Sequence, residues 1–154
     1  MAELVLVRHA QAAFGTDDYD RLTELGHRQA RWLGEYFAER AVEFDRVVTG
    51  TLRRHAETLA GIAESLPLPA AEAMPGLNEY HADVLLKAHL GERGLPPLEH
   101  AADRRGHFRV LREALYAWVD GTLRADAHLS FPEFEAGVRQ ALEAARHGAE
   151  RVLV

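Results

Sequence analysis

The hydrophobic positions along the chain alternate between short continuous runs and longer stretches with helical spacing. Residues 4–7 (LVLV) are a continuous apolar run, which is typical of a strand buried on both faces of a sheet. After them, Leu25, Ala30, Leu33 and Phe37 recur at helical spacing, and Thr23 is the predicted N-cap. The same reading predicts further strands at 44–50, near 70–73 and at 151–154, and helices within 22–40, 51–66, 82–90, 107–126 and 131–147.

This order of elements predicts the fold class. Strands alternate with helices at both ends of the chain, which indicates an α/β fold, a three-layer α/β/α sandwich with a mostly parallel central sheet. The middle of the chain predicts a helical insert at about 80–130 within a single domain of 1–154. Ligands of such sheets bind beyond the carboxyl ends of the strands, so candidate chemistry is sought there.

Composition excludes several classes of function. The 154 residues suit one domain, and the formal net charge of −6 leaves no overall basic surface for nucleic acid. The chain has no cysteine, no signal-peptide pattern and no apolar run long enough to span a membrane, so we expect a cytoplasmic protein. Its nine histidines show no metal-ligand spacing such as H-E-x-x-H, so we expect no metal and no other cofactor.

Two predicted strands end in residues suited to phosphate chemistry. The first delivers Arg8 and His9, and the second is followed by Arg53 and Arg54; the carboxylate of Glu79 comes later. Arginine binds phosphate oxygens bidentately and keeps its charge. A neutral imidazole is a nucleophile near neutral pH, and a protonated carboxyl group can donate to a leaving oxygen. These residue types together indicate phosphoryl transfer.

Four segments carry a resemblance to a known family. "LVRHAQA", "LTELGHRQA", "VVTGTLRRHAET" and "LNE" have the order and spacing of the histidine phosphatase superfamily, which includes the phosphoglycerate mutases. The resemblance implies that His9 is the nucleophile that forms a phosphohistidine, and that Arg8 and Arg54 bind the phosphoryl group. It also implies that Glu79 is the general acid and base, with Glu72 as the alternative.

The chain departs from the family pattern at several positions. Ala10 replaces the glycine of the R-H-G signature, and in the S-S-x-L-x-R-A-x-x-T segment Thr49 and Gly50 replace the two serines. Arg53 is expected on the surface. The remaining histidines are expected there too, except that His81 could line the cleft and His147 is expected as a cation at a helix C-terminus; those expected on the surface are His27, His55, His89, His100, His107 and His128.

The family places a second active-site histidine just after the strand that "RVLV" begins, beyond Val154. We expect that the intact protein continues past this residue. Two alternatives stay open: a short protein whose sheet is completed by another chain or left partly open, and a different alignment of this end. Arg146-His147-Gly148 spells the signature more literally, but it precedes a strand and so lies at the other end of the sheet.

The predicted function is a metal-independent phosphomonoester hydrolase that acts on a small phosphorylated molecule through a phosphohistidine. Its expected partners are that substrate or inorganic phosphate, without nucleic acid or membrane, and a homodimer stays open. Two alternatives remain. One is phosphoglycerate mutase-type transfer, although the segment after Glu79 lacks the longer stretch that grips substrate in those mutases. The other is a phospho-ligand binding or regulatory module that has lost turnover.

Overall fold

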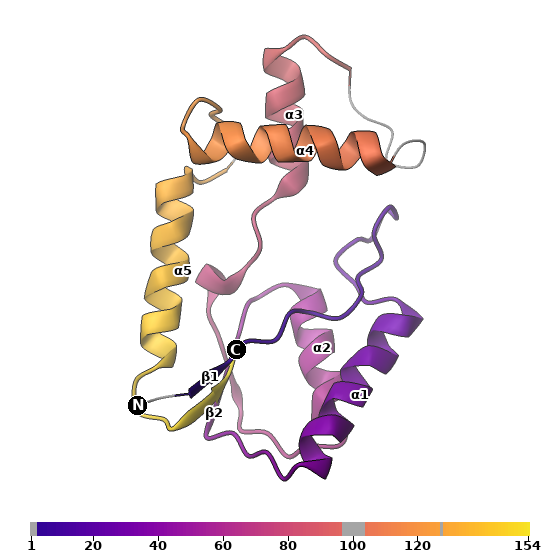
Figure 1. Ribbon diagram of the computed structural model, residues 1–154, viewed down its shortest axis with the longest axis vertical. Helices are drawn as coiled ribbons and strands as arrows, with labels where there is room; N and C mark the ends of the chain where they lie inside the picture. The colour runs from indigo at the N-terminus through magenta and orange to yellow at the C-terminus, as the bar shows by residue number, and fades with distance from the viewer. Residues whose placement is uncertain (1–2, 97–103, 127) are drawn as a thin grey trace. The chain divides into compact units, whose positions relative to one another are not determined.

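The computed structural model describes residues 3–96, 104–126 and 128–154 and has a mixed α/β fold (Figure 1). The strands are β1 (Glu3–Val5), β2 (Arg46–Thr49), β3 (Ala71–Ala73) and β4 (Arg151–Leu153). The helices are α1 (Glu24–Glu39), α2 (Arg53–Ala63), α3 (Ala82–Glu92), α4 (Arg104–Val119) and α5 (Phe131–Ala145), with a short 3-10 helix η1 (Pro75–Leu77). The predicted α/β class and the predicted order of elements are confirmed.

The sheet is parallel throughout, with strand order β1-β4-β2-β3. Neighbouring residues on each strand point to opposite faces. Val47 and Leu153 are partners in register and lie in one apolar cluster, whereas Val48 and Val152 lie in another. Both faces of the sheet are therefore buried, as the continuous apolar runs predict.

Helices cover both faces. Phe37 of α1 and Ile62 of α2 belong to the cluster of Val47 and Leu153, and Ala145 of α5 belongs to the other cluster. Figure 1 shows α1 and α2 beside each other, and glycine lets them approach: a Cβ at Gly34 would overlap the carbonyl oxygen of Ile62. The arrangement is the predicted three-layer sandwich.

The chain divides into two compact units. The first comprises the residues up to Asn78 and those from Val138 onward, and the second comprises Glu79–Gly137. The second unit has its own core around Trp118, which is 4% exposed and packs with Leu85, Ala114 and Leu123. The Trp118 indole nitrogen donates to the carbonyl oxygen of Leu129 at 2.9 Å. No described helix is both long and apolar enough to cross a bilayer.

The expectation of surface histidines is wrong for two of them. His89 and His107 are each only 4% exposed, because both lie on inward-facing positions of helices in the second unit. His128 is half-buried: its Nε2 accepts from the backbone N–H of His81 at 2.9 Å and its Nδ1 contacts the carbonyl oxygen of Leu129 at 2.8 Å. His100 lies outside the described residues.

Candidate active site

The histidine of the first signature lies at the carboxyl edge of the sheet. The pairing of β1 with β4 continues past Val5, because the Val154 N–H donates to the Val5 carbonyl and the Val7 N–H donates to the Val154 carbonyl at 2.7 Å. Arg8 and His9 follow directly, and Arg8 is exposed. Both residues therefore lie beyond the end of a strand, as predicted.

A hydrogen bond determines which nitrogen of His9 is available. His9 Nδ1 lies 2.7 Å from the carbonyl oxygen of Ala10, and a carbonyl oxygen can only accept. The proton of the neutral ring must therefore be on Nδ1. The lone pair of Nε2 is then available for attack on an electrophile.

The turn that follows His9 is attached to α2. The Ala10 N–H donates to the Thr58 hydroxyl at 3.0 Å, and that hydroxyl donates to the Arg54 carbonyl at 2.7 Å. Among the described residues other than glycine, a positive φ occurs only at Ala41. Alanine at position 10, where the family signature has glycine, is therefore compatible with the backbone.

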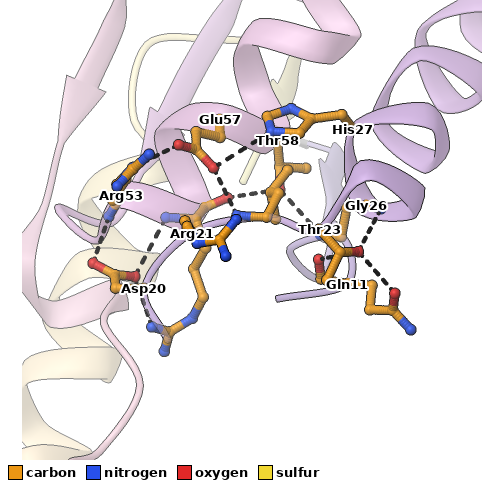
Figure 2. A network of polar contacts seen from close by, with 12 residues as sticks. Gln11, Asp20, Arg21, Thr23, Gly26, His27, Arg53, Glu57 and Thr58 are labelled. Atoms are coloured by element: carbon orange, nitrogen blue, oxygen red, sulfur yellow. Dashed lines mark hydrogen bonds and ion pairs between the residues drawn. The ribbon is translucent and has the colours of Figure 1, made fainter. Parts of the chain in front are cut away.

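The next residue, Gln11, is attached to the start of α1 (Figure 2). Its N–H donates to the Gln29 side-chain oxygen at 3.0 Å, and its own side-chain oxygen accepts from the Thr23 hydroxyl at 2.8 Å. Thr23 also caps the helix by accepting from the Gly26 N–H at 3.0 Å, as predicted. A Cβ at Gly26 would overlap the Gln11 carbonyl oxygen. Thr23, Gly26 and Gln29, three of the residues that the family motif specifies, thus hold the loop that carries His9.

Arg54 is buried, and its position depends on Asp20. Its Nη1 donates to Asp20 Oδ1 at 2.8 Å, and its guanidinium carbon lies 5.1 Å from the centre of the Tyr19 ring. Asp20 also accepts from the backbone N–H groups of Arg53 at 2.9 Å and Arg54 at 3.3 Å. Since the N-cap residue Leu52 makes no side-chain cap bond, Asp20 caps α2 from the neighbouring loop.

The environment of Asp20 favours its ionised form. Partial burial by itself raises the pKa of this carboxyl group. The hydrogen bonds from the backbone of Arg53 and from the backbone and side chain of Arg54 outweigh burial. The pKa of Asp20 therefore lies below its ordinary value of 3.8.

Arg53 lies on the surface, as predicted. Its Nε donates to Glu57 at 2.6 Å and its Nη1 to Asp18 at 3.0 Å, with about half of the side chain exposed. Glu57 also accepts the Leu22 N–H at 2.7 Å, and this bond, together with Arg53, lowers the pKa of Glu57 (Figure 2). Glu57 on α2 thus binds the loop before α1 through the Leu22 N–H and is itself held by Arg53.

Glu72 is unsuited to the acid role. Arg46 donates to both of its carboxylate oxygens at 2.7 Å, and the Arg46 Nη1 also donates to the Ala144 carbonyl at the end of α5. Arg46 opens β2, so this pair lies toward the amino edge of the sheet, away from His9. His147 is at that edge too, with its Nδ1 2.6 Å from the Glu143 carbonyl at the helix C-terminus.

Glu79 is the first residue of the second unit, so the proposal for its role rests on the motif. It directly follows Asn78, whose side chain accepts from the Thr51 N–H and donates to the Thr51 hydroxyl, each at 2.7 Å. The chain therefore enters Glu79 from a residue fixed beside the start of α2.

His55, one of the histidines expected on the surface, is half-buried. Its ring centre lies 5.9 Å from that of His9, with 27° between the ring planes. The structure thus brings His9 beside the first turn of α2, the turn that also carries Arg54. Sequence reasoning missed His55, Asp20, Thr58 and Gln29. The motif positions of Thr58 and Gln29 indicated a role, whereas nothing in the sequence indicated Asp20.

Among the described residues, no group of three or more histidine, aspartate or glutamate side chains is arranged to hold a metal ion. Arg8 precedes His9 in the sequence, and Arg54 lies in the same helix turn as His55, whose ring is stacked on that of His9.

Comparison with known proteins places the chain in a family. The model of the histidine phosphatase superfamily (branch 1) matches residues 4–154, and no curated protein sequence matches the chain. Among solved structures, "Mycobacterial hydrolase 1" is similar with a TM-score of 0.62 and 21% identity, covering 98% of this chain and 73% of that chain.

Two further structures share the fold. A mycobacterial glucosyl-3-phosphoglycerate phosphatase is similar with a TM-score of 0.62 and 21% identity, over 97% of this chain and 71% of that chain; the same phosphatase has been solved with inorganic phosphate and with VO3. A phosphoglycerate mutase from Bacillus anthracis str. Sterne has a TM-score of 0.59 and 21% identity, over 98% of this chain and 72% of that chain. The parallel sheet, the four ordered motifs and the family match over nearly the whole chain lead to one conclusion: the chain belongs to the histidine phosphatase superfamily, branch 1.

Proposed function

We propose that the protein is a metal-independent phosphomonoester hydrolase in which His9 is the nucleophile. The observation that carries this proposal is the bond between His9 Nδ1 and the Ala10 carbonyl, which leaves the Nε2 lone pair available at the carboxyl edge of the sheet. The bond from Ala10 to Thr58 keeps this turn in place. An oriented neutral imidazole is what in-line attack on phosphorus requires.

The reaction has two steps. His9 Nε2 attacks phosphorus and forms a P–N bond, while the ester P–O bond breaks and the leaving oxygen takes a proton from Glu79. Water, deprotonated by Glu79, then attacks the same phosphorus; the P–N bond breaks, inorganic phosphate leaves, and His9 becomes neutral again. Covalent catalysis of this kind divides one difficult displacement into two easier ones.

Arg8 and Arg54 bind the phosphoryl oxygens and offset the charge that they carry. The bond from Nη1 to Asp20 orients the Arg54 guanidinium, whose planar fork of N–H donors matches the geometry of phosphate oxygens. Because Asp20 holds Arg54 in a buried position, little side-chain entropy is lost when phosphate binds. The guanidinium groups supply the positive charge that a metal ion supplies in other phosphatases.

The comparisons support a small phosphorylated ligand. The similar mycobacterial phosphatase has been solved with inorganic phosphate and with VO3, and the family is named for phosphatase activity. The leaving group is left open, since groups grafted on a shared fold determine it.

Hydrolysis of an aryl phosphate in the presence of a chelator tests the proposal. We expect turnover of the wild-type protein, and a loss of about three orders of magnitude or more in kcat for His9→Ala. His147→Ala is the matched control, because His147 lies at the amino edge of the sheet, and it should retain wild-type activity. Undiminished hydrolysis by His9→Ala would contradict the mechanism. Saturable phosphate binding without turnover would instead support a binding module.

A further inference from the structure

His55 is the second imidazole near the proposed nucleophile. Its ring centre is 5.9 Å from that of His9 and the two planes are within 27° of parallel. His55 lies in the first turn of α2, next to Arg54 in the sequence and half-buried. Two imidazoles and a buried guanidinium therefore gather at one edge of the sheet.

Gly50 makes room for this ring. A Cβ at residue 50 would overlap Nδ1 of His55 and would lie 2.6 Å from the Asn78 side-chain oxygen. The Nδ1 edge of His55 thus occupies the place where a side chain at position 50 would begin. Asn78 is itself fixed by its two bonds to Thr51.

This packing explains two departures from the family segment together. The segment S-S-x-L-x-R-A-x-x-T has serine at the position of Gly50 and alanine at the position of His55. In this chain the side chain is lost at 50 and gained at 55, and the new ring fills the space of the old side chain. A serine hydroxyl at the strand end is thereby exchanged for an imidazole N–H.

We propose that His55 is a phosphate-binding residue, which donates from its imidazole to an oxygen of the phosphoryl group that His9 attacks. A tetrahedral phosphoryl group on His9 Nε2 projects oxygens out of the plane of that ring, and a ring stacked beside it can reach them. A second imidazole donor there adds to the hydrogen bonds from the arginines. This inference rests on the proposed function of His9.

The test uses inorganic phosphate as the probe and the side-chain ¹⁵N resonances of the histidines as one readout. We expect phosphate to shift the resonances of His55 and His9 and to leave those of His147 unchanged. Substitution supplies the second readout: His55→Ala should weaken phosphate binding about tenfold or more, since a hydrogen bond to a charged group is lost. Alanine is the residue of the family segment and a strong helix former, so the fold should persist.

Two further variants separate binding from structure. His55→Asn keeps a donor near the place of Nδ1 and should retain most of the affinity that His55→Ala loses. The double variant Gly50→Ser with His55→Ala restores the family pairing, and its serine hydroxyl should recover part of the affinity. Gly50→Ser alone should lose phosphate binding, because its side chain would overlap the ring of His55.

Some outcomes would overturn the inference. They are wild-type phosphate affinity in His55→Ala, a phosphate titration that shifts His9 but not His55, or no saturable phosphate binding by the wild-type protein. The failure of the proposed function looks different: His9→Ala would still hydrolyse the aryl phosphate, while His55 still responded to inorganic phosphate.

Discussion

At the scale of single residues, the chemistry depends on the hydrogen bonds around one short turn. His9 is oriented through Ala10, Ala10 is held by Thr58, and Thr58 also bonds to the backbone of Arg54. The Thr58 hydroxyl therefore connects the proposed nucleophile, His9, with the helix turn that carries Arg54, a proposed phosphate-binding residue. The family motif contains this threonine, and the structure supplies the reason for it.

Thr58→Val tests this connection. The substitution preserves shape but leaves the Ala10 N–H without its acceptor and removes the donor to the Arg54 carbonyl, so we expect a loss of about 1–3 kcal/mol in the free energy of unfolding. A small displacement of His9 should lower kcat more than it raises KM. Urea unfolding and steady-state kinetics measure both effects. Thr58→Ser keeps the hydroxyl and should restore most of each; if it fails to do so, the hydroxyl is not the connecting group.

Some residue roles could not be predicted because they depend on contacts between distant segments. Asp20 is an ordinary loop aspartate in the sequence, and only the fold brings it to the start of α2. The same holds for the ring of His55 beside His9. By contrast, both carboxylate oxygens of Glu72 accept from Arg46 at the start of the neighbouring strand, and this pairing argues against the acid role for Glu72.

At the scale of elements, local patterns predicted most of the structure. Apolar runs located the strands and helical spacing located the helices, and most ends differ from the prediction by a few residues. The exception is α4, which was predicted to reach 126 but ends at Val119, just before Gly121 turns the chain with a positive φ. The second helix was predicted from residue 51 but begins at Arg53, where Asp20 supplies the cap from outside the helix. The strand order β1-β4-β2-β3 is a long-range property that local patterns do not encode.

The cap on α2 makes a prediction about pH. The pKa of Asp20 is lower in the folded protein than its ordinary value of 3.8, so folding is favoured by its ionised form. This stabilisation is fully present when the pH is above the ordinary pKa of an aspartate. It is lost as the pH falls through the lower pKa that Asp20 has in the folded protein. At neutral pH, Asp20→Ala should lower the free energy of unfolding by about 1 kcal/mol or somewhat more, as the loss of other helix caps does.

Urea unfolding at a series of pH values measures this. The difference in unfolding free energy between the wild-type protein and Asp20→Ala should be largest at neutral pH and should shrink below 3.8. Asp18→Ala is the matched control, because Asp18 is an exposed neighbour that forms ion pairs with the surface residues Arg21 and Arg53, and it should change stability little. A difference that does not depend on pH would show that the charge of Asp20 is unimportant for the cap.

At the scale of the whole molecule, the overall charge and the local charge have opposite signs. The chain carries a formal net charge of −6, yet Arg8, Arg53 and Arg54 all lie near the carboxyl edge of the sheet. The net charge therefore carries no information about a site for a small anion, which depends on where the arginines lie. The motifs led to the proposed site, and the structure shows that Thr23, Gln29 and Thr58 of these motifs hold the loop of His9.

The division into two units limits what the sequence could predict about the reaction. His9, Arg8 and Arg54 belong to the first unit, and Glu79 opens the second. The insert was predicted at about 80–130, and the second unit spans Glu79–Gly137. Its core around Trp118 could not be foreseen in detail, because packing among three helices depends on which faces meet.

The most direct test of His9 as the nucleophile is to trap the phosphohistidine itself. The wild-type protein is mixed with an aryl phosphate, the reaction is stopped in alkali because phosphohistidine is acid-labile, and the phosphorylated residue is located by mass spectrometry of the peptides. We expect one phosphoryl group on His9, formed and lost at rates that match turnover, and none in His9→Ala. Turnover without phosphorylation of His9, or phosphorylation of another residue at the turnover rate, would contradict it.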